Sequence, residues 1–100
     1  MSEIEKIDEV IHGRLRLAIM AYLANAESGS FNELMDALGA SKGNLSVQIR
    51  KLEDAGYIEV DKRIVARKTL TTCRLTKDGK AAFRTYLDNL TSMLGLPTPK

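Results

Sequence analysis

The sequence predicts an α+β fold that is mainly α-helical, with one small β-hairpin. Apolar residues recur at spacings of three and four over most of the chain, which is the period of an amphipathic helix. Over residues 58–61 and 71–75, apolar or β-branched residues alternate with polar ones instead, which is the period of a half-exposed strand. The chain has 100 residues, of which 44% are hydrophobic and 28% charged, and this fits one domain with one core. We therefore expect a single domain over residues 1–100.

The N-terminal third is predicted to be helical. Ile4, Ile7 and Ile11 recur at spacings of three and four and indicate a short helical segment. The run LRLAIMAYLA, which follows Arg14, is rich in Ala and Leu and is apolar on more than one face. This composition is typical of a helix that is buried on several sides. The Ser-Gly-Ser sequence at 28–30 is expected to end it.

Two shorter helices are expected next, with a sharp turn between them. Ser30 and Glu33 have the spacing of a capping box at the start of a helix that Gly39 ends. Ser41 is a second candidate N-cap. It precedes one apolar helical stripe: Leu45, Ile49 and Leu52. Gly56 is expected to end this helix. Because only two residues separate the two helices, we predict a helix-turn-helix.

The chain after Gly56 has the pattern of two strands and a last helix. Ile58 and Val60 alternate with acidic residues, and apolar and β-branched residues alternate again over 71–75. The stretch 62–69 between them carries four basic residues and no acidic one. We therefore predict a hairpin with a cationic tip. Thr76 is expected to cap a helix with these apolar positions: Phe83, Tyr86, Leu87, Leu90 and Leu94.

The net charge of +2 conceals an uneven distribution. Residues 1–40 hold three basic and seven acidic residues, a net charge of −4. Residues 41–80 hold ten and five, a net charge of +5, and residues 81–100 hold two and one, a net charge of +1. An asymmetry of this kind indicates a surface that faces a polyanion. A basic face that is merely solvated is the alternative.

The expected helix at 41–55 has the composition of a helix that reads a DNA major groove. Its first half contains no Asp or Glu, which phosphates would repel, and its Asn, Gln and Arg residues can pair with adenine and guanine. A helix-turn-helix followed by a cationic hairpin is a winged helix, whose hairpin lies on the flanking backbone or minor groove. The candidate double-stranded DNA-binding residues are Ser41, Lys42, Asn44, Ser46, Val47, Gln48 and Arg50 of the helix and Lys62, Arg63, Arg67 and Lys68 of the hairpin. The alternatives are an ordinary amphipathic helix and a solubilising hairpin.

Three segments resemble the MarR- and ArsR-like regulators of bacteria and archaea. IHGRLRLAIMAYL resembles their first helix, SKGNLSVQIRKLEDAGYIEV their recognition helix and first wing strand, and CRLTKDGKAAF the turn into their last helix. The resemblance implies a sequence-specific DNA-binding transcriptional regulator, which we expect to act as a repressor. The single Cys cannot form an internal disulfide, which fits a cytoplasmic protein. We expect the chain to divide into an N-terminal segment (1–12), a helix-turn-helix with its wing (13–76), a C-terminal helix (77–94) and a tail (95–100).

The resemblance further implies a homodimer on a pseudo-palindromic operator. The N-terminal segment and the last helix exceed what one small core needs, so we expect them to form the dimer interface. The candidate residues are Ile4, Ile7, Ile11, Tyr86, Leu90, Met93 and Leu94. The alternative is that these residues cover the core of their own subunit.

Several other functions lack support in the sequence. No nucleophile–base pair, phosphate-binding glycine loop or H-E-x-x-H motif is present, so we do not expect an enzyme or a cofactor. One Cys and one His cannot supply the four ligands of a zinc site, and no apolar run is long enough to span a membrane. His12 is expected to cap a helix or to pack locally.

Two other functional hypotheses remain open at this stage. A winged helix can instead bind a protein partner within a larger assembly. Cys73 could act as a redox switch, although its place on the inward side of a strand favours a small buried hydrophobe. A chain of 100 residues leaves little room for the effector pocket of larger MarR-like proteins, so a small-molecule effector stays unassigned.

Overall fold

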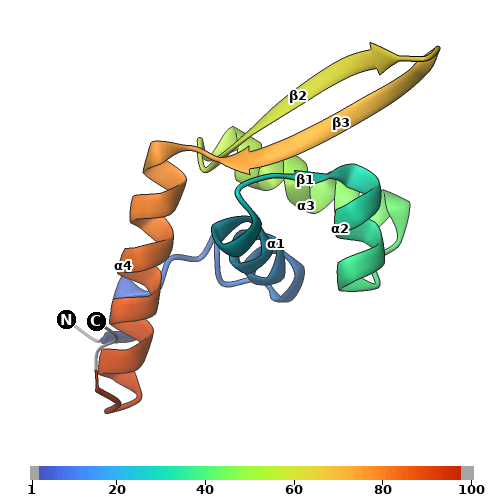
Figure 1. Ribbon diagram of the computed structural model, residues 1–100. Helices are drawn as coiled ribbons and strands as arrows, with labels where there is room; N and C mark the ends of the chain where they lie inside the picture. The colour runs from blue at the N-terminus through green and yellow to red at the C-terminus, as the bar shows by residue number, and fades with distance from the viewer. Residues whose placement is uncertain (1–2, 98–100) are drawn as a thin grey trace.

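The computed structural model describes residues 3–97, and side chains from Ile4 onward (Figure 1). Residues 1–2 of the predicted N-terminal segment and 98–100 of the predicted tail lie outside the described residues. The elements in chain order are a short 3-10 helix (Glu3–Lys6), α1 (Arg14–Ala26), β1 (Gly29–Ser30), α2 (Phe31–Leu38), α3 (Lys42–Asp54), β2 (Ile58–Val65), β3 (Lys68–Leu75) and α4 (Lys77–Met93). This is the predicted winged helix-turn-helix, with four helices and one antiparallel sheet.

The helix-turn-helix forms where its capping residues predict. The Ser30 hydroxyl accepts a hydrogen bond from the Glu33 amide (3.0 Å), and the Glu33 carboxylate accepts one from the Ser30 amide (2.8 Å). The bond from the Ser30 amide favours the ionised carboxylate and lowers the pKa of Glu33. Gly39 ends α2 in the left-handed conformation with φ 60°, and the Ser41 hydroxyl caps α3 by accepting from the Asn44 amide (3.2 Å). The predicted capping box at Ser30 and Glu33, the helix end at Gly39 and the N-cap at Ser41 are confirmed.

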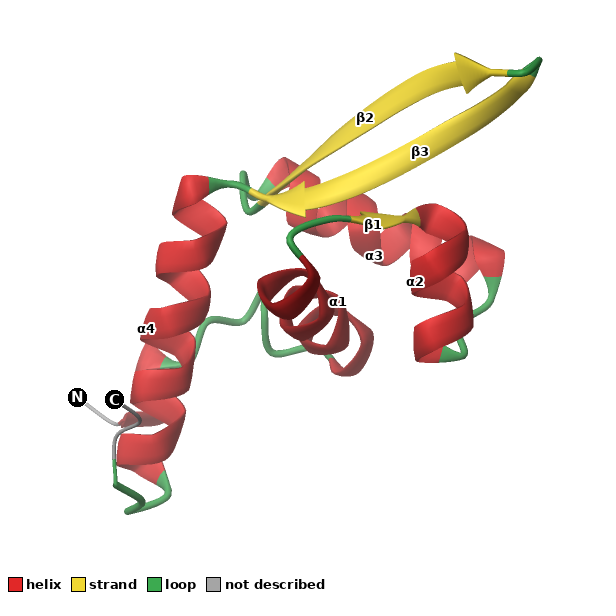
Figure 2. Ribbon diagram, viewed as in Figure 1, coloured by secondary structure: helices red, strands yellow, loops and turns green. Residues whose placement is uncertain are grey.

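The sheet has one strand more than the sequence predicts. Strand β1 pairs with β3, so the strand order is β1-β3-β2 and all pairs are antiparallel (Figure 2). Gly29, which was expected only to end a helix, lies opposite Cys73 in this pairing. A Cβ atom at Gly29 would lie 2.8 Å from the Tyr22 ring, so the missing side chain is what lets the strand approach α1.

The hairpin strands also extend further than predicted. The stretch 62–69 was expected to be a basic tip, but most of it continues the two strands, with Val65 paired to Lys68. Only Ala66 and Arg67 make the turn, and both have positive φ angles of 50° and 66°. Two consecutive positive φ angles are the geometry of a type I′ turn, which joins strands without splaying them. The cationic side chains therefore project from a long paired ribbon rather than from a loop.

One hydrophobic cluster holds the elements together. The predicted apolar stripe of α3 faces inward, and Leu45 and Leu52 are fully buried. The cluster consists of Ile7, Ile11, Ile19, Met20, Leu23, Leu34, Leu45, Ile49, Leu52, Ile58, Cys73, Leu75 and Tyr86. No member comes from residues 59–72, although Val60 packs against the cluster, so the outer hairpin (62–70) takes no part in the core.

Three of the seven residues predicted for a dimer interface belong to this core instead. Ile7, Ile11 and Tyr86 are 9%, 0% and 1% exposed, so their own subunit already covers them. The reason is that Asp8 folds the N-terminal segment inward: its carboxylate accepts from the Val10 amide (2.8 Å) and from the Tyr57 hydroxyl (2.5 Å). For these three residues, the alternative that they cover the core of their own subunit is therefore correct. Leu90 is half-buried against the core, whereas Ile4, Met93 and Leu94 remain exposed.

The turn from β3 into α4 depends on two small residues. The Thr76 hydroxyl accepts from the Gly79 amide (2.9 Å) and donates to the Gly56 carbonyl (2.6 Å). A Cβ atom at Gly79 would overlap the Tyr57 carbonyl, so α4 can begin here only with glycine at this position. The LTKDG sequence at 75–79 therefore joins the wing, the end of α3 and α4 at one point.

Candidate nucleic-acid interface

Helix α3 presents a polar face without acidic residues in its first three turns. Of its predicted contact residues, Gln48 is half-buried. The others are exposed: Ser41, Lys42, Asn44, Ser46, Val47 and Arg50. Val47 is 52% exposed although it is apolar, which leaves it available to a thymine methyl group. Gly43 has no atom within 4 Å of the place where a Cβ would lie. Nothing inside the subunit therefore requires glycine at this position.

Two of these residues are linked to each other and to α1. The Arg16 guanidinium donates from Nη1 to Gln48 Oε1 (2.6 Å), and Gln48 Nε2 donates to Asn44 Oδ1 (3.0 Å). Arg16 Nε also donates to the Val10 carbonyl (2.5 Å), and Nη2 donates to the Glu9 carbonyl (3.4 Å). The sequence pattern did not single out Arg16. A charged residue within the otherwise apolar run of α1 was the signal that could have identified it.

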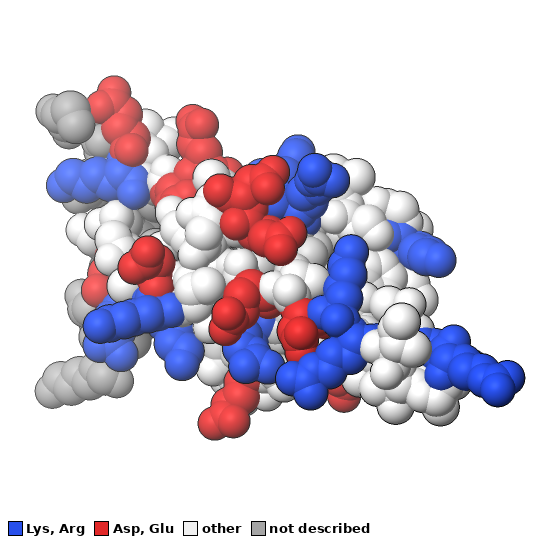
Figure 3. Space-filling model, turned by 90° about the horizontal axis from the view of Figure 1, so that it is seen from above, with Lys and Arg blue, Asp and Glu red and all other residues white. Residues whose placement is uncertain are grey.

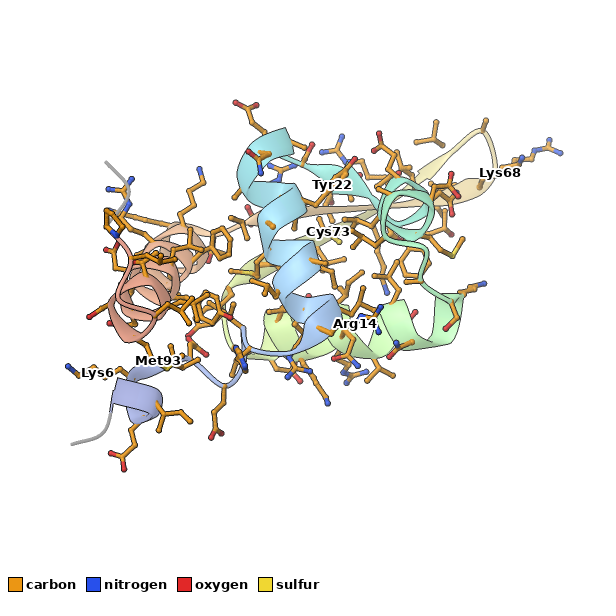
Figure 4. All side chains as sticks on the ribbon, turned by 90° about the horizontal axis from the view of Figure 1, so that it is seen from below. Lys6, Arg14, Tyr22, Lys68, Cys73 and Met93 are labelled. Carbon is orange, nitrogen blue, oxygen red and sulfur yellow. The ribbon has the colours of Figure 1, made fainter. Side chains whose placement is uncertain are left out.

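A cleft of about 500 Å³ opens beside this network. It is lined by Arg14, Leu15, Arg16 and Ala18 of α1, Leu38, Gly39 and Ala40 of the turn, and Asn44 and Gln48 of α3. Arg14 lies at the start of α1 and faces this region (Figure 4). The lining contains two arginines, both from α1, and no acidic residue, and α3 contributes the uncharged amides of Asn44 and Gln48 to the same open surface.

The hairpin carries the second group of predicted contacts. Lys62, Arg63, Arg67 and Lys68 are all exposed, and Lys68 lies at the end furthest from the helices (Figure 4). Among the described residues, Arg63 alone of the four has an ion pair, with Asp61 (2.7 Å). That pair is largely exposed and therefore contributes little to stability. Acidic side chains gather over the middle of the face in Figure 3, and the far end of the hairpin is basic.

Exposed apolar side chains accompany these cations, and the sequence pattern did not reveal them. Ile64 is 80% exposed, Val65 53% and Leu70 42%. The strict alternation of the strand ends at Val60, and this change was the available signal. The outer hairpin therefore offers a surface of mixed apolar and basic character, which suits a groove wall of sugars and phosphates.

Cys73 and His12 have structural surroundings. Cys73 is fully buried, and burial, together with the charge of Glu53, raises the pKa of its thiol to about 11. A thiol of this kind is poorly ionised near neutral pH, so the predicted buried hydrophobe is confirmed. His12 was predicted to cap a helix or to pack locally, but it contacts Tyr86 of α4, 74 residues away, with Nδ1 2.8 Å from the Tyr86 hydroxyl. It does not cap α1, whose N-cap is Gly13.

Within 3–97, no group of three or more His, Cys, Asp or Glu side chains is arranged to hold a metal ion. No helix of this part of the chain combines the length and the apolar character needed to cross a membrane.

Comparison with known proteins gives matches of sequence and of structure. The family of winged helix DNA-binding domains matches residues 15–94. An uncharacterized protein of Methanocaldococcus jannaschii is 30% identical over 79 residues, which cover 79% of this chain and 86% of the relative. A transcriptional regulator homologue from Pyrococcus horikoshii OT3 has a TM-score of 0.87 at 26% identity, over 95% of this chain and 96% of its own.

A further match is relevant to the geometry of the site. A mutant MarR from E. coli, solved in complex with operator DNA, has a TM-score of 0.62 at 16% identity, over 95% of this chain and 77% of its own. At this identity the match shows a shared fold. The matching family consists of DNA-binding domains rather than enzymes. The chain belongs to the winged helix DNA-binding domain family and has the fold of MarR- and ArsR-like transcriptional regulators.

Proposed function

We propose that this protein is a sequence-specific, double-stranded DNA-binding transcriptional repressor. Helix α3 lies in the major groove, and the hairpin lies on the flanking backbone or in the minor groove. The observation that carries the proposal is that the acid-free, exposed face of α3 and the basic outer hairpin, the two surfaces that a winged helix applies to DNA, hold most of the chain's excess positive charge. The operator complex of the similarly folded E. coli MarR supports this arrangement.

The two surfaces have different roles in this proposal. Arg50, Asn44 and Ser46 offer the donors and acceptors that read base edges. Lys62, Arg67 and Lys68 are point charges on an exposed ribbon, which suits contact with phosphates and gives affinity without sequence information. Arg63 contributes less charge because Asp61 already pairs with it.

We also propose a homodimer that places two copies of α3 on a pseudo-palindromic operator. The exposed residues Ile4, Met93 and Leu94 lie on the 3-10 helix and at the end of α4, on the opposite side of the molecule from the hairpin tip (Figure 1). A contact there would leave both DNA-binding surfaces free. Half-sites one helical turn apart require the two recognition helices to be about 34 Å apart.

Selection of bound fragments from random duplex DNA tests the proposal. A palindromic consensus is expected, and binding to it should weaken steeply as the salt concentration rises. Recovery of no consensus, together with a stoichiometric protein partner in a pull-down, would instead support the alternative of a protein-interaction module. Unpaired half-sites in the consensus would contradict the dimer alone.

A further inference from the structure

We propose that Arg16 of α1, although it lies outside the recognition helix, determines which base Asn44 reads. This inference rests on the proposed function, because it concerns the same α3 surface in the major groove. It starts from the hydrogen-bonded series Arg16–Gln48–Asn44, in which each amide is held by the previous side chain.

The direction of this series is set by the guanidinium group. Arg16 has donors and no acceptor, so the Gln48 amide must turn its oxygen toward Arg16. The nitrogen of Gln48 then faces Asn44, whose oxygen must accept from it. Asn44 is left with its two Nδ2–H donors at the outer end, and no residue within 3–97 accepts from them.

Arg16 is itself held in place by contacts other than the one with Gln48, so the position of its guanidinium group does not depend on Gln48. Its Nε and Nη2 atoms donate to the carbonyls of Val10 and Glu9. The side chain is half-buried between the N-terminal segment and α3, and it lines the cleft beside them. A residue fixed in this way is a positioning residue for Asn44 rather than a base contact of its own.

The consequence is a change in the expected base. A free asparagine pairs with adenine by donating to N7 and accepting from N6. Asn44 Oδ1 already accepts from Gln48, so the side chain acts mainly as a donor. In the major groove, the edge that offers two acceptors is that of guanine, with N7 and O6. We therefore expect guanine opposite Asn44.

Selection from random duplex DNA with matched variants tests this inference. Asn44→Ala first identifies the operator position that Asn44 reads, as the position whose preference it abolishes. The wild type should prefer guanine over adenine there by about tenfold, the size of one good base contact. Arg16→Met should reduce this preference to about twofold or less, because the Gln48 amide can then turn either way.

The sharpest variant is Gln48→Glu, which keeps the shape of the side chain and the contacts of Arg16. The carboxylate accepts from Arg16 and also from Asn44 Nδ2, so Asn44 turns its oxygen outward. The base preference at the operator position that Asn44 reads should change from guanine to adenine. Lys51→Gln changes the charge of α3 by the same single unit and should leave the preference unchanged. Arg14→Met is the matched control for Arg16→Met.

The outcomes separate this inference from the proposed function. If the wild type selects no consensus, the proposed function fails. If it selects a consensus but Asn44→Ala alters no position, or the position that Asn44 reads prefers adenine, the role of Arg16 is overturned and the function stands. An unchanged guanine preference in folded Gln48→Glu protein would overturn it as well. Thermal unfolding of each variant shows whether it is folded.

Discussion

The recognition helix and the wing are both basic and exposed, but they are anchored very differently. Helix α3 buries Leu45, Ile49 and Leu52 in the core and has a side-chain cap at Ser41. Every residue from 62 to 70 in the hairpin is exposed, and none joins the core. A base-reading side chain must be held in position, whereas a charge that meets a phosphate acts over a broader range of positions. The difference in anchoring therefore matches the difference in proposed role.

The largest effect should come from removing the anchor of α3. Leu52→Ala deletes a fully buried side chain and should lower the free energy of unfolding by about 2–5 kcal/mol. Leu70→Ala, on the outer hairpin, should change it by less than about 0.5 kcal/mol, because that side chain is 42% exposed. Urea denaturation of both variants measures the contrast. A comparable loss in both would show that the hairpin is anchored as firmly as the helix.

The next effect concerns base readout. Arg50→Ala should weaken binding to the selected operator by about 1–3 kcal/mol and relax the preference at one position. Binding to unrelated duplex DNA should weaken much less, since a base contact is lost. Titration of both duplexes at one salt concentration gives the two values. An equal loss on both duplexes would assign Arg50 to the phosphates instead.

The wing should show the opposite behaviour. Replacing Arg67 and Lys68 together with Ala should weaken binding to operator and to unrelated DNA alike. The slope of log affinity against log salt should become less steep by about 2, since each lost phosphate contact contributes about 0.9. Titrations at several salt concentrations give this slope. Replacement of the ion-paired Arg63 should change it less. A consensus that changes in the double variant would mean that the wing also reads bases.

The smallest effect tests the helix itself. Gly43→Ala should stabilise the protein by about 0.5–1 kcal/mol, because alanine favours a helix and the space for its Cβ is open. The same methyl group should weaken DNA binding if the backbone of α3 approaches the DNA closely at this point. Thermal unfolding measures the change in stability, and operator titration measures the change in affinity. A stabilised variant with unchanged affinity would place Gly43 away from the DNA.

Local chemistry explains which features were predictable. The capping box of Ser30 and Glu33, the cap at Ser41 and the left-handed Gly39 act within a few residues, so sequence spacing reveals them. Strand β1 was missed because two residues have no period of their own and pair only through their position beside Cys73. The strands were predicted too short because exposed residues over 62–70 break the apolar alternation although the backbone pairing continues.

The site residues divide in the same way. The polar face of α3 and the basic hairpin follow from periodicity and charge, and the structure places them on exposed surfaces. Ile7, Ile11 and Tyr86 were predicted for a dimer interface because the N-terminal segment and the last helix exceed what one small core needs. The hydrogen bonds of Asp8 bring the N-terminal segment onto the core instead. Arg16 was missed because its partner Gln48 lies 32 residues away.

The sequence by itself determined the four helices, the N-caps of the last three, the wing and the basic character of residues 41–80, because each depends on neighbours in the chain. Only the tertiary structure decided which apolar residues are left exposed and how the amides on α3 are oriented. Those properties depend on which surfaces meet after folding, as Tyr86 against His12 and Arg16 against Gln48 show. No local period encodes such long-range contacts.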